Sequence, residues 1–75
     1  MILFRVNLPG RPSVIASAER WFDVRKWASI QFPDHTDVEF INDASAPIDF
    51  ELRWIGREQD QKMQVRATGG EWEAA

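Results

Sequence analysis

The stretch from Ile48 to Ile55 has the cleanest alternation of apolar and polar residues in the chain, and this pattern constrains the fold most strongly. Its apolar members at every second position are Ile48, Phe50, Leu52 and Trp54. A period of two residues is that of a β-strand with one buried face. The sequence therefore predicts a central strand at residues 48–55, and the fold must include a sheet around it.

Weaker alternating runs elsewhere in the chain predict the rest of the sheet. Residues 2–8 form the first run, and the Leu8–Arg11 segment that follows has the proline and glycine of a type II turn. The chain is then expected to return as a strand at residues 13–16, so the opening is a hairpin. The other predicted elements are strands at residues 38–42 and 62–67 and a turn cluster at residues 42–47.

One segment, residues 17–32, has helical spacing. Ser17 is a suitable N-cap, and Pro33 disfavours helical geometry in the residue before it. Apolar residues repeat along one face of this helix, which predicts that the face packs on the core. The expected core stripe consists of Trp21, Val24, Ala28 and Phe32.

These elements predict an α+β fold in the order ββαβββ, with a two-layer arrangement of a mostly antiparallel sheet and one helix packed on one face. We expect a single domain over residues 1–68 and a flexible C-terminal tail over residues 69–75, unless Trp72 docks. One helix cannot cover both faces of the sheet, so the second face is expected to meet water or a partner. The residues expected on that open face are Arg5, Asn7, Glu39, Ile41, Glu51, Arg53, Gln64 and Arg66.

The small size of the chain limits how it can be stabilised. A domain of 75 residues buries only about 60% of the surface that its unfolded chain exposes. The sequence has no cysteine, which excludes disulfides and cysteine-ligated zinc. Its four tryptophans and five phenylalanines are therefore expected to supply most of the buried area.

The charge and hydropathy of the sequence indicate a cytoplasmic protein that is not a general phosphate binder. The net charge of −3 and the pI near 5.0 disfavour non-specific nucleic-acid binding, which depends on Lys and Arg. The N-terminal apolar run is too short for a signal peptide and is interrupted by Arg5. We expect no membrane association and no small-molecule substrate.

Catalytic and metal-binding patterns are sparse in this sequence. The single histidine, His35, lies between Asp34 and Asp37 in a segment expected to be a solvated loop. Gly69 and Gly70 lack the strand, helix and lysine of a phosphate-binding loop. We therefore predict that the protein is not an enzyme and has no catalytic residue, cofactor or metal site.

Some apolar residues do not fit the predicted core and are candidates for a contact surface. On a helical wheel Phe22 lies about 100° from Trp21, and Ile30 lies nearly opposite the core stripe. Aromatic residues near arginine are typical of interface anchors. The candidate interface residues are Phe22, Ile30, Trp27, Ile41 and Ile55. The expected partner is another protein or a second copy of the chain, which would add buried area to a small domain.

Nucleic-acid binding through the open face is the alternative function. The basic residues that could contact a single strand there are Arg5, Arg53, Lys62 and Arg66. However, the strand aromatics are predicted on the helix-covered side, and Glu39, Asp49 and Glu51 are expected to share the open face. Protein interaction is therefore the preferred interpretation.

The run from Ala16 to Ala28, which follows a strand and a Pro-Gly turn, resembles small uncharacterised accessory proteins encoded by tailed bacteriophages. The resemblance depends on a hairpin followed by a Trp-Phe-Asp-x-Arg helix, matched here by Trp21, Phe22, Asp23 and Arg25. It implies a small accessory protein in an infected bacterial cytoplasm that binds or inhibits a host factor, and it carries no assigned activity.

Overall fold

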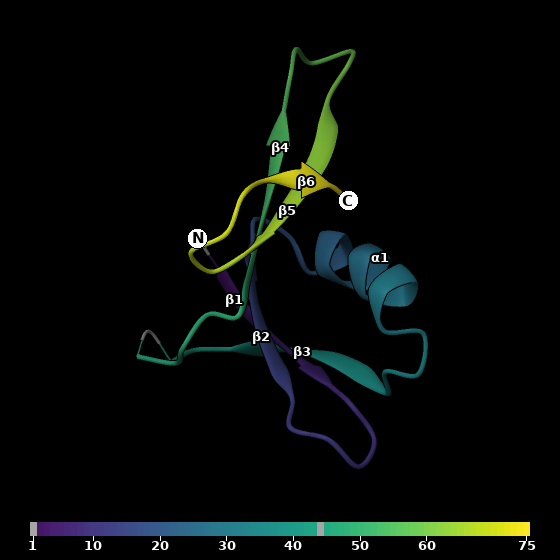
Figure 1. Cartoon of the computed structure of the whole chain (residues 1–75), viewed down its shortest axis with the longest axis vertical. Coiled ribbons are helices and arrows are strands. Elements are labelled where there is room, and N and C mark those ends of the chain that lie inside the picture. The colour runs from purple at the N-terminus through teal and green to yellow at the C-terminus, as the bar shows by residue number, and fades with distance from the viewer. Residues whose placement is uncertain (1, 44) are drawn as a thin grey trace.

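A computed structural model describes residues 2–43 and 45–75, which form one helix and a six-stranded sheet (Figure 1). The elements in chain order are β1 (Ile2–Asn7), β2 (Val14–Ala18), α1 (Trp21–Gln31), β3 (Asp37–Ile41), β4 (Phe50–Ile55), β5 (Lys62–Ala67) and β6 (Glu73–Ala74). Met1 and Ala44, the latter within the predicted turn at residues 42–47, lie outside the described residues.

The sheet is open and mostly antiparallel, with the strand order β3-β1-β2-β4-β5-β6. Only β2 and β4 pair in parallel among the described strands. The predicted α+β class, the single helix and the mostly antiparallel sheet are confirmed. The predicted order ββαβββ lacked β6, because two residues are too few to give an alternating pattern.

The β1–β2 hairpin forms as the alternation of its residues predicts. Phe4 pairs with Ala16 and Val6 pairs with Val14, so the small and large apolar side chains of the two strands share one face. Gly10 has a φ of 67°, which suits the third position of a type II turn and which residues with a side chain rarely adopt.

The helix begins later than the sequence pattern predicted. Ser17, expected as the N-cap, instead belongs to β2, where it pairs with Leu3 on one side and Glu51 on the other and is 2% exposed. Arg20 occupies the N-cap position without a side-chain capping hydrogen bond. Pairing with two neighbouring strands extends β2 through Ala18, and this outweighs the local capping preference of serine.

The face of α1 that packs on the sheet is also rotated from the predicted one. Val24 and Ala28 are fully buried as expected, whereas Trp21 is 41% exposed and Trp27 is 3% exposed. Trp21 lies at the start of the helix, and its indole N–H donates to the carbonyl of Val38 at 2.7 Å. This hydrogen bond holds the indole against the edge strand β3, outside the centre of the core.

Trp27, and not Trp21, is the tryptophan of α1 that lies in the core. Its ring meets Phe32 edge to face at 5.5 Å between centroids and tilts against Phe50 at 4.9 Å. The buried cluster around it comprises Phe4, Val6, Ala16, Ala18, Val24, Trp27, Ala28, Val38 and Leu52. The core therefore lies between α1 and the middle strands of the sheet.

The helix covers only part of its side of the sheet. A helix of 11 residues is about 16 Å long, and six strands at a spacing of about 4.8 Å span about 24 Å. The contacts of α1 are mainly with β1, β2 and β3. The β4–β5 hairpin extends beyond the rest of the sheet, and α1 lies to one side of it (Figure 1).

The parallel pairing of β2 with β4 is short and is extended by Asp49. Only Ala16 with Phe50 and Ser17 with Glu51 are strand partners. Just before β4, the Asp49 amide donates to the Ile15 carbonyl at 2.8 Å, and an Asp49 carboxylate oxygen accepts from the Ile15 amide at 2.8 Å. The Asp49 side chain thus takes the place of a backbone acceptor and aligns the start of β4.

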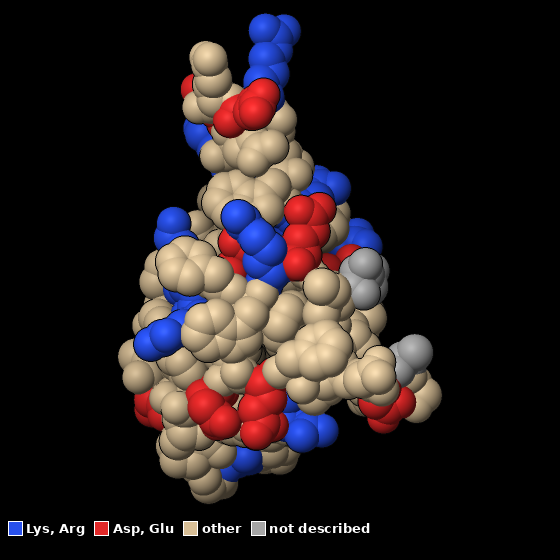
Figure 2. Space-filling view, turned by 180° about the vertical axis from the view of Figure 1, so that it is seen from behind, with Lys and Arg blue, Asp and Glu red and all other residues tan. Residues whose placement is uncertain are grey.

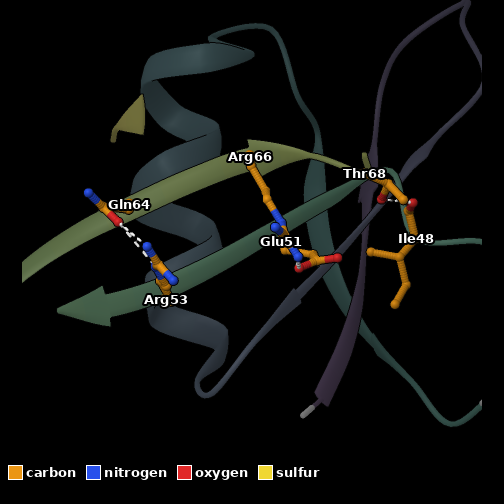
Figure 3. A network of polar contacts seen from close by, with 6 residues as sticks. All are labelled: Ile48, Glu51, Arg53, Gln64, Arg66 and Thr68. Atoms are coloured by element: carbon orange, nitrogen blue, oxygen red, sulfur yellow. Dashed lines mark hydrogen bonds and ion pairs between the residues drawn. The ribbon is translucent and has the colours of Figure 1, made fainter. Parts of the chain in front are cut away.

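Two further contacts hold the segment that leads into β4. The Thr68 amide donates to the Asp49 carbonyl at 3.0 Å, and the Thr68 hydroxyl donates to the Ile48 carbonyl (Figure 3). Earlier in this segment, the hydroxyl and amide of Ser45 donate to Asp43 and hold the pKa of that carboxyl below its ordinary value. The described part of the crossing from β3 to β4 is therefore held by polar side chains of its own and by Thr68, which follows β5.

Candidate functional site

The outer face of α1 combines exposed apolar and basic side chains. Phe22 is 65% exposed and Ile30 is 73% exposed. Arg25, Lys26 and Ser29 are the other exposed residues between them on the helix. Asp23, the one carboxylate in the α1 sequence, is buried. We call Phe22, Arg25, Lys26, Ser29 and Ile30 the outer face of α1, and its exposed groups are apolar, cationic or neutral.

The molecular surface also has a broad area without charged side chains. Seen from behind, this tan area forms a band across the middle of the molecule, with blue and red side chains above and below it (Figure 2). The narrow upper end in the same view is the β4–β5 hairpin, which carries charged side chains of both signs (Figure 2). Uncharged surface is thus gathered on the body of the domain.

A cleft lies where α1 leaves the β4–β5 hairpin uncovered. Its volume is about 310 Å³. The residues that line it are Lys26, Ile30, Trp54, Gln61, Lys62, Met63, Ala74 and Ala75. The lining contains two lysines and no acidic side chain, so apolar residues line the cleft together with Gln61 and two cationic groups.

A buried carboxylate positions Trp54 beside this cleft. Asp23 is 3% exposed and accepts a hydrogen bond from the Trp54 indole N–H at 3.0 Å. It also accepts from the Arg20 guanidinium at 3.1 and 3.2 Å. Arg20 in turn lies over the Trp54 ring, 5.9 Å from its centroid. These contacts join the first turn of α1 to β4 and fix the orientation of Trp54.

The five candidate interface residues do not lie on one surface. Phe22 and Ile30 share the outer face of α1, but Trp27 belongs to the core. Ile41 is half-buried in β3, and Ile55 is 38% exposed at the end of β4. β3 is one edge of the sheet and β4 lies three positions away in strand order. Only Phe22 and Ile30 can therefore contact one partner surface together.

The open face of the sheet holds paired arginines. Arg53 donates to the Gln64 side-chain oxygen at 2.9 and 3.0 Å, and Arg66 donates to Glu51 at 2.8 and 3.0 Å (Figure 3). Arg5 lies on the same face and pairs with Glu39 at 3.5 Å. Most of the positive charge on this face is therefore engaged within the protein.

Trp72 adds an aromatic ring to this face that alternation within the strands did not reveal. The Arg53 guanidinium lies 4.0 Å and that of Arg66 4.6 Å from the Trp72 ring centroid. The chain reverses after β5 with Gly69 at a φ of 84°, and β6 then pairs with Gln64 and Val65. Trp72 thus docks on the sheet, and residues 73–74 pair with β5. The sequence signal that could have predicted this docking is a tryptophan that follows a Gly-Gly pair and a strand containing an arginine.

The side chains around His35 are engaged in separate contacts. Asp34 accepts two hydrogen bonds from Arg11 at 2.7 and 2.9 Å, and Asp37 accepts one from Asn7 at 2.9 Å. The Nδ1 atom of His35 lies 2.8 Å from the Phe32 carbonyl oxygen. Across residues 2–43 and 45–75 there is no group of three or more His, Cys, Asp or Glu side chains that could hold a metal ion.

Comparisons with known proteins do not assign the chain to a family. Among the described residues, no helix has both the length and the apolar composition needed to cross a bilayer. No family model matches the sequence, and neither a curated protein nor a solved structure matches it.

Proposed function

We propose that this chain is a small non-enzymatic protein-interaction module of the bacterial cytoplasm, and that it binds or inhibits a host factor if it is encoded by a phage. The observation that carries this proposal is the exposure of Phe22 and Ile30 on the same helix, at 65% and 73%. Covering these side chains would remove apolar area from water, which is the main favourable term in most protein association.

The composition of the outer face of α1 also suits protein binding. Interface anchors are enriched in aromatic residues and arginine, and Phe22 and Arg25 are of these types. α1 is fixed to the sheet by Trp27 and Asp23, so its outer face is presented in a rigid form. Little conformational entropy would then be lost when a partner binds.

A second copy of the chain fits this face less well than a different protein does. In a two-fold dimer with antiparallel α1 helices, Phe22 of one copy would pack near Ile30 of the other. Lys26 lies midway between Phe22 and Ile30, so it would then face Lys26 of the second copy. Like charges placed together across an interface are unfavourable, so we favour a different protein as the partner.

Replacing both apolar anchors with serine, in a Phe22→Ser, Ile30→Ser variant, is expected to abolish capture of the partner and leave the fold intact. Both residues are exposed, and substitutions at exposed sites usually change stability by less than about 0.5 kcal/mol each. The tagged variant, the wild type and a Gln31→Ser control are compared by affinity capture from bacterial lysate and quantitative mass spectrometry. The control changes an exposed polar residue of the same helix.

At least one protein should be enriched by the wild type and the control but not by the double variant. Capture of the same proteins by all three would contradict the proposal. Sedimentation at increasing concentration tests self-association, because a dimer that forms in the wild type and not in the double variant would assign this face to a second copy.

Nucleic-acid binding by the open face is a second candidate function, and the position of Trp72 is the observation that favours it. Bases stack on aromatic rings in single-strand binding proteins, and arginine supports such stacking. Trp72 lies over Arg53 and Arg66, and a cavity of about 300 Å³ lies beside it. The pairing of Arg5 and Arg66 with glutamates lowers the charge available for phosphate.

If the open face binds single strands, Trp72→Ala is expected to weaken binding about tenfold, because stacking of one base contributes about 1–3 kcal/mol. Fluorescence anisotropy with a labelled single-stranded oligonucleotide measures this at low and moderate salt. Arg53→Glu should abolish binding, whereas Arg57→Glu, outside the strands, makes the same change in charge as a control. Binding that is absent, or that both charge reversals weaken equally, would exclude this function.

A further inference from the structure

We infer that the cleft between α1 and the β4–β5 hairpin binds an acidic amphipathic segment of a partner protein. An apolar side chain of that segment would enter the cleft, and its flanking carboxylates would pair with Lys26 and Lys62. This inference rests on the proposed function and names the site and the chemistry of the partner.

The floor of the cleft is apolar and accessible. Ile30 is 73% exposed, and Trp54 and Met63 are half-buried. The polar atom of the Trp54 indole is already satisfied by Asp23 at 3.0 Å, so Trp54 contributes an apolar ring to the lining. A side chain that entered this space would bury apolar surface of Ile30, Trp54 and Met63 without leaving the Trp54 indole N–H unpaired.

The charge around the cleft specifies an acidic partner. Lys26 and Lys62 are the lining residues with charged side chains, and they come from opposite sides, α1 and β5. Ala75, which carries the main-chain carboxylate of this chain, also lines the cleft, and the two lysines outnumber that single negative charge. Within the described residues, the ion pairs are made by Arg5, Arg11, Arg20 and Arg66, so both lysines are available to a partner. The chain as a whole has a charge of −3, and the cleft is therefore a local exception to an acidic surface.

The size of the cleft limits what enters it. Its volume of about 310 Å³ is at the lower end of the range of about 300–1,000 Å³ for ligand sites. A cavity of about 150 Å³ holds one benzene-sized group, so the cleft has room for about two large apolar side chains of the partner segment. The rest of the partner segment would lie along the outer face of α1, where Phe22 and Arg25 continue the apolar and basic character.

The inference is tested by titrating the ¹⁵N-labelled full chain with synthetic peptides and recording amide chemical shifts. The test peptide has Leu at helical i, i+3, i+4 and i+7 spacing and Glu elsewhere. A matched peptide has Lys in place of each Glu, and a second has Ser in place of each Leu. We expect the acidic leucine peptide alone to bind, with the largest shifts at Lys26, Ile30 and Met63 and with affinity that falls as salt is added.

Charge reversal at the cleft is the decisive comparison. Lys26→Glu and Lys62→Glu are each expected to weaken binding of the acidic leucine peptide by about five- to tenfold, because each turns an attraction into a repulsion. Arg57→Glu makes the same change in charge in the connection between β4 and β5 and should have less than about a twofold effect. The amide spectra of the free variants show whether each has kept its fold.

Three results would overturn the inference: no binding of the acidic leucine peptide, equal binding of the serine peptide, or shifts centred on the open face around Arg53 and Trp72. Its failure can be told apart from failure of the proposed function. If the peptide does not bind but the Phe22→Ser, Ile30→Ser variant still loses captured proteins, the proposed protein-interaction function stands. Only the inference of an acidic amphipathic partner then fails. If that variant captures everything the wild type does, the proposed function fails whatever the peptide does.

Discussion

Replacing Trp27 with alanine is expected to lower the free energy of unfolding by about 3–5 kcal/mol, the cost typical of removing a buried large aromatic side chain. Trp27 is 3% exposed and contacts the rings of Phe32 and Phe50. Its loss would leave a cavity at the point where α1, the segment after it and β4 meet. At about 0.05–0.15 kcal/mol per residue, a chain of this length has little stability to spare, so the variant should be largely unfolded at 37 °C.

Urea denaturation followed by far-ultraviolet circular dichroism measures this effect without relying on tryptophan fluorescence. Phe22→Ala is the matched control, because it removes an aromatic ring from the same helix at a site that is 65% exposed. The control should change the free energy of unfolding by less than about 1 kcal/mol. Equal losses from the two substitutions would mean that Trp27 is not the centre of the core.

The second large effect is expected from Asp23→Ala, which should lower the free energy of unfolding by about 2–3 kcal/mol. The substitution removes the acceptor of the Trp54 indole N–H and of the Arg20 guanidinium. Arg20 is 65% exposed in its side chain and can return to water, so most of the loss comes from the partly buried Trp54 donor. The junction between α1 and β4 should loosen as a result.

Asp34→Ala provides the matched control for this prediction. Asp34 is also paired with an arginine, Arg11, at 2.7 Å, but its side chain is 52% exposed. Exposed ion pairs contribute only about 0–1 kcal/mol, so the control should have a small effect. A double-mutant cycle of Asp23→Ala with Trp54→Phe should show coupling, and additivity within about 0.5 kcal/mol would contradict the assigned hydrogen bond.

The strands and the fold class could be predicted because they depend on residue patterns that repeat over short distances. Alternation in residues 2–8 and 48–55 requires a half-buried strand wherever that strand is placed in the sheet. The exposure of Phe22 and Ile30 follows in the same way from helical spacing, since both lie away from Val24 and Ala28 on the wheel. These properties are local, so the sequence is sufficient to predict them.

Two features of α1 were not predictable in this way: where the helix begins, and which of its two tryptophans is buried in the core. Ser17 has the residue type of an N-cap, but pairing with β1 and β4 keeps it in a strand. Trp21 and Trp27 both fit a helical stripe, and the Val38 carbonyl on β3 draws Trp21 to the edge of the sheet. In each case a partner that is distant in sequence outweighs a local preference.

Residue patterns along the chain were sufficient for the class of fold, most of the strands and the exposed apolar character of the outer face of α1. Three features depend on the packing of distant segments: Asp23 is buried beside Arg20 and Trp54, Trp72 lies over Arg53 and Arg66, and a cleft lined in part by two lysines opens beside the β4–β5 hairpin. This division arises because periodicity shows which side of a helix or strand is buried, whereas strand order and the short length of α1 decide which groups become neighbours.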